Sequence, residues 1–426
     1  MTIIVFLSVL LGAMILGVPI AFALLLGGLA LMVHMDMFDA QILAQNLING
    51  VDSFPLMAVP FFMLAGVVMN VGGLSKRIVN LAMALVGHVR GGLGYVAILA
   101  SVIMASLSGS AVADAAALGA LLIPMMASSG HNLGRSCGLI AAGGIIGPII
   151  PPSIGFIVFG VATGESISKL FLAGIVPGVM LGTSLVLTWW FVVRQENIEP
   201  PPKKSTQEVV AALLDGIWAL VLPFIIVFGL KFGIFTPTEA GVVAAVYSLF
   251  VAVFVYRELK PKDLVHVFVA AASTTAVVMF LVGSAMVSAW LITVADLPGQ
   301  LIELLRPLLD SPRLLVGIIM IVIVAVGMTM DMTPIILILA PVLTPLVKEA
   351  GVDPIYFGVV FIINTAIGLI TPPVGTVLNV VSGVGKIKMD ELVKGIWPFI
   401  LAELAVLFLL ILFPALVTVP AHWFYK

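Results

Sequence analysis

The sequence predicts an all-α, polytopic membrane protein. Three observations support this fold class: the composition, the length of the apolar stretches and a weak internal repeat. Of the 426 residues, 62% are hydrophobic and 9% are charged, whereas about a quarter of a soluble globular chain is charged. Many apolar stretches reach the roughly 20 residues that a helix needs to cross a bilayer. They lack the alternating pattern of a membrane β-barrel, so helices are expected.

The first half of the chain, residues 1–193, is expected to form six elements. The apolar N-terminus has no basic flank and is too long for a cleaved signal, so we interpret it as a retained membrane helix. An amphipathic stretch after the second span is expected to lie along the membrane interface. The expected elements are spans at 3–33 and 52–71, an interfacial piece at 73–83, a hairpin at about 92–128, a broken helix at 136–164 and a span at 171–193.

A polar, proline-rich segment at 194–205 divides the chain near its middle and is expected to be a linker. Together with a connecting helix at about 208–231 it makes up residues 194–235. The second half, residues 236–426, is expected to repeat the first. Its elements are spans at 236–257 and 264–293, an interfacial piece at 297–305, a hairpin at about 313–347, a broken helix at 354–384 and a span at 396–420.

The two halves share a weak sequence repeat. The matched residues occur in the same order in both halves, which argues against chance. One isolated aspartate lies in a polar run of each half. Charged residues at membrane depth are expensive and usually mark an ion or substrate path. Several matches differ by 217 positions and later ones by 221. The aligned pairs include Asp114 with Asp331, Pro124 with Pro341, Gly147 with Gly368, and Pro151-Pro152 with Pro372-Pro373.

The aspartate-bearing segments at 92–128 and 313–347 admit two interpretations. Each is long enough for two full crossings, or it could be a re-entrant hairpin that enters and leaves on one side. Gly109 and Gly327, each with hydroxyl side chains close by, favour the hairpin. Non-helical backbone is tolerated at membrane depth where protein or a water-filled cavity surrounds it.

Positive charges predict that the repeat is inverted. If the linker at 194–205 is cytoplasmic, the basic clusters near Arg90, Lys260 and Lys388 also fall inside, as the positive-inside rule requires. Arg313 then falls outside as a minority exception. The connecting helix makes the second half enter from the opposite side of the membrane.

The first half offers oxygen ligands for a hard cation. Hydroxyl groups flank the turn at Gly109, and Pro151 and Pro152 break the following helix. Because proline has no amide hydrogen, carbonyls about one turn earlier lose their helical partners. Secondary transporters use such freed carbonyls to hold Na⁺, although a simple proline kink is the alternative. The first predicted sodium site comprises Ser106, Ser108, Ser110, Gly147, Ile150, Pro151 and Pro152.

The second half predicts a matching site that is richer in side-chain oxygens. It comprises Gly327, Thr329, Asn364, Gly368, Thr371 and Pro372. The half-helices that begin at the turns direct positive dipole ends toward the centre, which favours an anionic substrate between the two sodium sites. The candidate substrate-binding residues are Ser110, Ser153, Asp114 and Asp331. The two aspartates could instead cap the half-helices, attract the cations, or relay protons.

Composition excludes several other functions. The net charge of −2 gives no indication of nucleic-acid binding, and the single cysteine, Cys137, cannot form an internal disulfide. No histidine or cysteine cluster predicts a transition-metal site or a cofactor, so sodium is the only ion expected. We interpret Cys137 as a small buried residue.

Four motifs, in order along nearly the whole chain, resemble the large membrane subunit (M or DctM type) of TRAP transporters, the tripartite ATP-independent periplasmic class. They are Ser108-Gly-Ser-Ala-Val-Ala-Asp114, Ile150-Pro-Pro-Ser-Ile154, Phe235-Thr-Pro-Thr-Glu-Ala-Gly241 and Ile370-Thr-Pro-Pro373. One departure is Gly155, where the family pattern often has proline. It softens the restart of the broken helix and leaves the resemblance intact.

The resemblance implies sodium-driven uptake of an organic anion across a bacterial inner membrane by an elevator mechanism. It implies two partners, a small membrane subunit with about four helices and a periplasmic substrate-binding protein. Family substrates are mostly carboxylates. Similarity to members that carry acidic sugars favours sialic acid or another sugar acid, with C4-dicarboxylates as the alternative. The sequence gives neither the substrate nor the number of sodium ions per cycle.

Two rival functions remain open from the sequence. An intramembrane aspartyl protease also needs two membrane-embedded aspartates, but its usual Gly-x-Gly does not precede Asp114 or Asp331. A channel would conduct ions without bound substrate, whereas a transporter would show saturable, sodium-dependent uptake. The predicted function is therefore transport, without enzymatic activity.

Overall fold

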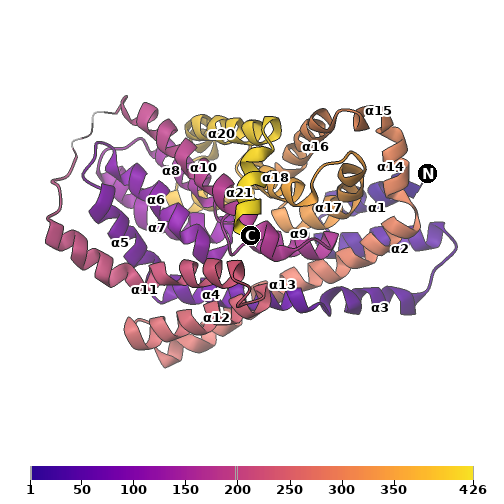
Figure 1. The fold of residues 1–426 in the computed structure, drawn as a ribbon, viewed down its shortest axis with the longest axis horizontal. Helices are drawn as coiled ribbons and strands as arrows, with labels where there is room; N and C mark the ends of the chain where they lie inside the picture. Colours follow the sequence, from indigo (N-terminus) through magenta and orange to yellow (C-terminus); the bar gives the residue numbers. More distant parts are fainter. Residues whose placement is uncertain (1, 197, 199, 426) are drawn as a thin grey trace.

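The computed structural model describes residues 2–196, 198 and 200–425, which form helices joined by turns and loops, with no strand among them. Eight of the helices described there are long and apolar enough to cross a membrane. This confirms the all-α, polytopic fold class (Figure 1). The helices are α1 Thr2–Ile15, α2 Ile20–His34, α3 Ala40–Val51, α4 Ala58–Val71, α5 Leu74–Val86, α6 Gly92–Ser108, α7 Ala111–Ser128, α8 Leu133–Gly144, α9 Ile154–Thr163, α10 Ile167–Val193, α11 Thr206–Lys231, α12 Pro237–Phe250, α13 Pro261–Val294, α14 Leu297–Leu304, α15 Arg306–Leu309, α16 Pro312–Gly327, α17 Met332–Glu349, α18 Pro354–Gly368, α19 Thr376–Gly385, α20 Met389–Leu412 and α21 Ala415–Tyr425.

Two expected spans are wrong, because each is two helices. The segment expected at 3–33 is α1 and α2, which pack against each other. Gly17 has a φ of 81°, and Pro19 precedes α2, so the helix cannot continue through this point. The segment expected at 396–420 is α20 and α21, which separate at Phe413 and Pro414.

The region between α2 and the second span holds a helix that the sequence analysis missed. Asp39 caps α3 by accepting hydrogen bonds from the amides of Gln41 and Ile42, at 2.7 and 3.2 Å. α3 packs along α13. Two residues of the expected linker, Asn197 and Glu199, lie outside the described residues, and α11 begins after the linker at Thr206.

The aspartate-bearing segments each form two helices that pack against one another. α6 and α7 are joined at Gly109 and Ser110, and α16 and α17 at residues 328–331. Pro-Pro interrupts the next segment in each half. Residues 145–153 separate α8 from α9, and residues 369–375 separate α18 from α19. The structure therefore contains two helical hairpins and two broken helices, as predicted.

The two halves pack reciprocally across the centre of the molecule. The second part of each broken helix lies against the hairpin of the other half, α9 on α17 and α19 on α7. At one of these contacts, a Cβ added to Gly155 would lie 3.2 Å from the sulfur of Met332, the first residue of α17. These two contacts join both hairpins and both broken helices into one body. Two repeated halves are expected to make such equivalent contacts.

The helix bounds correct the alignment between the halves. α7 and α17 both contain 18 residues, and their first residues, 111 and 332, differ by 221. The offset of 217 is therefore wrong in the hairpins. The structural counterpart of Asp331 is Ser110, since both residues cap the second helix of a hairpin. Asp114 lies one turn farther into α7 and has no acidic counterpart.

A second layer, α3, α4, α11, α12 and α13, lies along one side of this body (Figure 1). α13 is the longest helix, with 34 residues, and contacts α2, α3, α4 and α17. The expected interfacial stretch forms α5, which packs on α11 and is joined to it by an ion pair between Arg77 and Asp215 at 3.1 Å.

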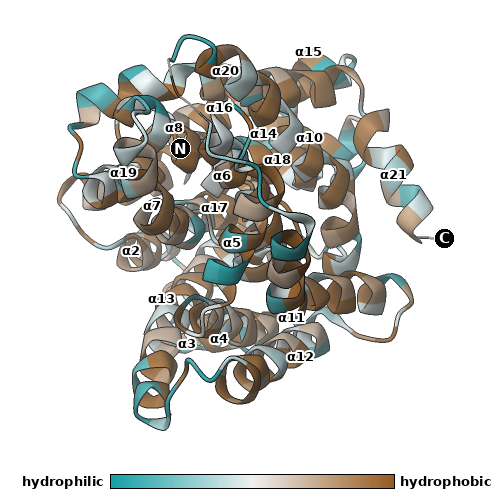
Figure 2. Cartoon of the chain, turned by 90° about the vertical axis from the view of Figure 1, so that its left-hand side faces the viewer, coloured by the Kyte–Doolittle hydropathy of each residue, from teal (hydrophilic) through white to brown (hydrophobic). Residues whose placement is uncertain are grey.

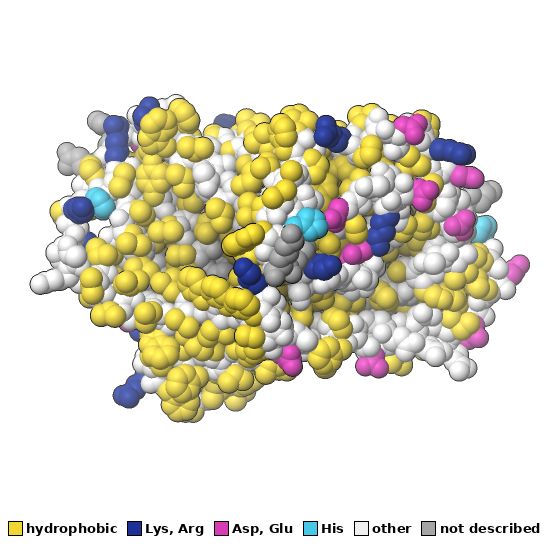
Figure 3. All heavy atoms as spheres, in the orientation of Figure 1, with side chains coloured by type: hydrophobic (Ala, Val, Ile, Leu, Met, Phe, Trp, Pro, Cys, Tyr) yellow, Lys and Arg dark blue, Asp and Glu magenta, His cyan; other side chains and the backbone are white. Residues whose placement is uncertain are grey.

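The surface is largely apolar, as a membrane protein requires. Hydrophobic side chains cover much of the face shown in Figure 3. The helices are mostly hydrophobic in Figure 2, where the hydrophilic colours gather at helix ends and connections. Exposed large side chains on α11 include Leu214, Phe224 and Phe228.

We predict that Gly395→Val lowers the melting temperature of the purified protein in detergent. A Cβ at Gly395 would lie 2.2 Å from backbone atoms of Gly134 on α8, where no flexible side chain can move away. Overpacking costs about 1–3 kcal/mol. Gly383→Val on α19 is the control, because a Cβ there meets nothing within 4 Å. Equal melting temperatures for the two variants would contradict this close helix contact.

Candidate ion and substrate site

The first break leaves several backbone carbonyls without partners. Ser153 caps α9, since its hydroxyl oxygen accepts the amide of Phe156 at 3.1 Å, and the same hydroxyl donates to the carbonyl of Pro148. Within the described chain, the carbonyls of Gly147, Ile150 and the two following prolines accept no hydrogen bond. Every residue from 145 to 153 is buried.

The turn of the first hairpin touches this break. Gly109 has a φ of +63°, and a Cβ there would lie 2.5 Å from the carbonyl oxygen of Pro152. Glycine is the residue that fits here, because it adopts a positive φ readily and has no Cβ to collide with the carbonyl oxygen. A Cβ added to Gly147 would likewise lie 2.6 Å from Asp114 Oδ2. The two glycines allow the hairpin turn to approach the freed carbonyls.

Asp114 has one satisfied oxygen and one without a partner. Its side chain is 1% exposed, and Ser108 Oγ donates a hydrogen bond of 2.5 Å to Oδ1. Asp114 Oδ2 has no hydrogen-bond partner among the described residues, although it lies beside Gly147. A buried acceptor without a donor is costly. The first site therefore presents a buried carboxylate oxygen next to free carbonyls.

The other two serines of the first site make hydrogen bonds to the backbone. Ser110 caps α7 by accepting the amide of Ala113 at 3.4 Å, and its own amide donates to Ser108 Oγ at 3.2 Å. Ser106 donates to the carbonyl of Ile103 within its own helix, at 2.5 Å. Ser108 is thus the serine with a direct side-chain bond to Asp114, while the hydroxyl of Ser106 is directed to its own backbone.

The second hairpin also touches the second break. Gly327 and Gly368 are in close contact, since a Cβ on Gly327 would lie 2.9 Å from Gly368 Cα. The amide of Gly375, at the end of the break, donates to the carbonyl of Met328 at 3.2 Å. Thr371 Oγ1 donates to the carbonyl of Ile367 at 2.7 Å. Of the predicted residues of this site, Gly327 and Gly368 are therefore in contact, and Thr371 lies in the same break as Gly375.

Asn364 supplies the unsatisfied oxygen of the second half. Its side chain is fully buried, and Nδ2 donates to the carbonyl of Met320 on α16 at 2.7 Å. Asn364 Oδ1 has no partner among the described residues. The sequence analysis missed Thr376, the first residue of α19, whose buried hydroxyl oxygen also lacks a partner. Its position directly after the Pro-Pro break was the available signal.

The two turns differ in exposure. Ser108 and Gly109 are buried at the first turn, whereas Thr329 and Asp331 are exposed at the second, where Met330 is buried. Asp331 caps α17 by accepting the amide of Met332 at 2.8 Å, so the capping interpretation describes Asp331. It does not describe Asp114, because Ser110 is the cap of α7.

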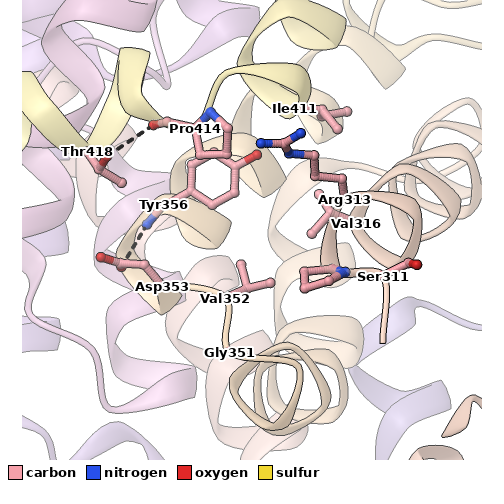
Figure 4. A pocket seen from close by; sticks show the side chains of 11 residues that line it. Ser311, Arg313, Val316, Gly351, Val352, Asp353, Tyr356, Ile411, Pro414 and Thr418 are labelled. Carbon is pink, nitrogen blue, oxygen red and sulfur yellow. Dashed lines mark hydrogen bonds between the residues drawn. The ribbon is translucent and has the colours of Figure 1, made fainter. Parts of the chain in front are cut away.

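A separate cavity of about 490 Å³ lies away from both breaks (Figure 4). It is formed between the start of α16, the start of α18 and the connection from α20 to α21, and the guanidinium of Arg313 lies beside the ring of Tyr356. None of the predicted site residues lines it. The cavity is therefore not the predicted ion and substrate site.

Hairpins that meet broken helices are typical of membrane transporters, and comparison with known proteins gives the family. Residues 7–416 match the family described as tripartite ATP-independent periplasmic transporter, DctM component. The chain belongs to this family of TRAP transporter large permeases.

Two relatives agree with this assignment, and one solved structure shares the fold. The 2,3-diketo-L-gulonate TRAP transporter large permease protein YiaN of Escherichia coli (strain K12) is 60% identical over 99% of this chain and 100% of its own. The sialic acid TRAP transporter large permease protein SiaM of Vibrio cholerae is 37% identical over 95% of each chain. The crystal structure of the Alcanivorax borkumensis YdaH transporter shares the fold, with a TM-score of 0.65 and 15% identity over 89% of this chain and 90% of that chain.

Family membership confirms several predictions. The chain is the large permease component of a tripartite transporter and a multi-pass protein of the bacterial inner membrane. It is a transport protein rather than an enzyme, which removes the protease alternative.

We predict that Gly147→Ala abolishes or strongly reduces transport while the protein still folds. The added methyl group would collide with Asp114 Oδ2 at 2.6 Å and would push the carboxylate away from the break. Uptake by the reconstituted transporter is the measurement. Gly317→Ala on α16 is the matched control, because a Cβ there has nothing within 4 Å. Full activity of Gly147→Ala would show that the position of Asp114 at this break is unimportant.

Proposed function

We propose that the chain carries an organic anion inward together with sodium ions that bind at the two helix breaks. One observation supports this most strongly. Each half buries a side-chain oxygen without a hydrogen-bond donor, Asp114 Oδ2 in the first half and Asn364 Oδ1 in the second. Asp114 lies beside Gly147 in the first break, and Asn364 lies near the end of α18, where the second break begins.

The donor set fits sodium chemically. A hard cation prefers oxygen, and secondary transporters hold Na⁺ with unwound carbonyls and the C-terminal ends of half-helices. In the first site, Asp114 Oδ2 would join the carbonyls of Gly147 and Ile150. In the second site, Asn364 Oδ1 would join Thr371 and the carbonyls after Gly368. A sodium ion would supply the positive partner that these buried oxygens lack.

The helix ends around the breaks support an anionic substrate. α7, α9, α17 and α19 all begin at a turn or a break. A helix N-terminus presents free amide groups and a partial positive charge of about half an elementary charge. We place the carboxylate of the substrate among these ends, close to Ser110 and Ser153.

A sugar acid is the best-supported class of substrate. The relative at 60% identity is a permease for 2,3-diketo-L-gulonate, and the sialic acid permease is 37% identical. Both substrates are sugar-derived carboxylates, and the difference in identity favours the smaller one over sialic acid. We propose that a small membrane subunit of about four helices and a periplasmic binding protein complete the transporter.

We propose an elevator mechanism in which the body of hairpins and broken helices moves against the layer of α3, α4 and α11–α13. The unequal exposure of the two turns supports it, since Thr329 and Asp331 at the second turn are exposed and Ser108 and Gly109 at the first are buried.

The inverted arrangement predicts that the two turns react from opposite sides of the membrane. Thr329→Cys and Ser110→Cys would be introduced separately with Cys137→Ser as the background, and each would be treated with a membrane-impermeant maleimide from either side. We expect each turn to react from one side, and the sides to differ. Reaction of both turns from the same side would contradict the inverted repeat.

Sodium dependence is tested by uptake into proteoliposomes that contain the large and small subunits, with the binding protein supplied outside. We predict that Ser108→Ala raises the sodium concentration for half-maximal uptake about tenfold. A hydrogen bond to a charged group is worth about 1.5–3 kcal/mol, and the variant loses the 2.5 Å bond that orients Asp114. Thr371→Ala should raise the sodium concentration for half-maximal uptake severalfold, because it removes an oxygen of the second site.

Thr183→Ala is the control for Thr371→Ala. Its hydroxyl makes the same kind of bond to a carbonyl four residues earlier, at 2.8 Å, on the exposed side of α10. Unchanged sodium activation in both site variants would refute the site assignment. Uptake of 2,3-diketogulonate, sialic acid and a C4-dicarboxylate, each with its own binding protein, would identify the substrate class; uptake of the C4-dicarboxylate alone would overturn the sugar-acid proposal.

A further inference from the structure

Glu403 is a buried acid that neither predicted sodium site includes. It lies in the middle of α20, a helix long and apolar enough to span the membrane, and its side chain is 0% exposed. Both carboxyl oxygens lack a hydrogen-bond partner among the described residues. An ionised carboxylate in this position would have no compensation for the lost hydration, which costs several kcal/mol or more.

Contacts with α8 place Glu403 beside the first break. α8 and α20 run in the same direction, since a Cβ on Gly134 would lie 2.7 Å from the carbonyl oxygen of Glu391, and one on Gly138 would lie 2.8 Å from Ile396 Cα. Counting seven residues on from the Gly138–Ile396 contact along both helices, a distance of about 10 Å, places Glu403 level with Ile145. Ile145 directly follows α8 and begins the break.

A hydrogen bond joins α20 to α18, the first part of the second broken helix, as well. Tyr356, in the first turn of α18, donates from its hydroxyl to the carbonyl of Leu410 in the last turn of α20, at 3.0 Å. α20 therefore packs against the first parts of both broken helices, α8 and α18.

The charged and titratable side chains on neighbouring helices lie toward helix ends, away from this depth. Lys394 is nine positions before Glu403 on α20 itself. α19 carries no charged side chain, and Lys386 follows it. The groups on the described parts of the helices that contact α20 are Arg135 and Cys137 on α8, Lys169 on α10, Arg313 on α16, Tyr356 on α18 and His422 on α21, with Asp390 and Glu391 at the start of α20.

We propose that Glu403 is a proton-binding site at the junction of the two broken helices, and that its carboxyl group stays protonated while the transporter works. The proton removes the charge that would otherwise be unpaired. A neutral Glu403 also adds no negative charge next to the sodium sites, so it does not trap the ions there.

The direct test is infrared spectroscopy of the purified wild-type protein and Glu403→Gln at pH 6 and pH 8. The wild-type-minus-variant spectrum should contain the C=O stretch of a protonated carboxylic acid at both pH values. Glu391→Gln is the matched control, because Glu391 is exposed on the same helix and should contribute carboxylate bands instead. If Glu403→Gln does not fold, Glu403→Leu gives the same comparison.

Carboxylate bands assigned to Glu403, in the absence of sodium or after it is added, would overturn the proposal and make Glu403 an ionised group or a sodium ligand. This test does not depend on sodium-coupled transport, so it can fail or succeed separately from the proposed function. In proteoliposomes, Glu403→Gln should keep the sodium concentration for half-maximal uptake within about twofold of wild type, because the amide preserves a neutral donor. A change of tenfold or more would also contradict the proposal.

Discussion

The structure depends on how backbone carbonyls freed inside a membrane are satisfied. A membrane interior offers no water to an unpaired carbonyl, so interrupted helices persist there only where protein or a bound ligand supplies a partner. In this protein, Pro-Pro pairs free carbonyls in both halves, and the hairpin turns approach them through glycines at 109 and 327. The proposed ion binding, substrate binding and movement all depend on this close approach of turn and break.

The two halves share this architecture but use different side chains. In the first half a carboxylate, Asp114, lies beside the break and is oriented by Ser108. In the second half a neutral amide, Asn364, holds α18 to α16 through the Met320 carbonyl. If both proposed sites bind sodium, this difference in charge would give them different affinities and would allow an ordered sequence of binding.

The sequence contained enough information to predict the hairpins and broken helices, because glycine at a turn and proline without an amide hydrogen have local physical consequences. It could not give the helix register: the isolated aspartates suggested an offset of 217, whereas the helix bounds pair Ser110 with Asp331. Apolar runs also hid the divisions before α2 and α21. The unsatisfied oxygens of Asn364 and Thr376 could not be predicted, since they depend on contacts between distant segments.

Structure determination of the complete transporter in lipid nanodiscs, with sodium and then with choline replacing it, tests the central claim most directly. With sodium present, ion density is expected within coordination distance of Asp114 Oδ2 and of Asn364 Oδ1. That density should be absent when choline replaces sodium. Protein or water donors that satisfy both oxygens in either salt, with sodium bound elsewhere, would contradict the central claim.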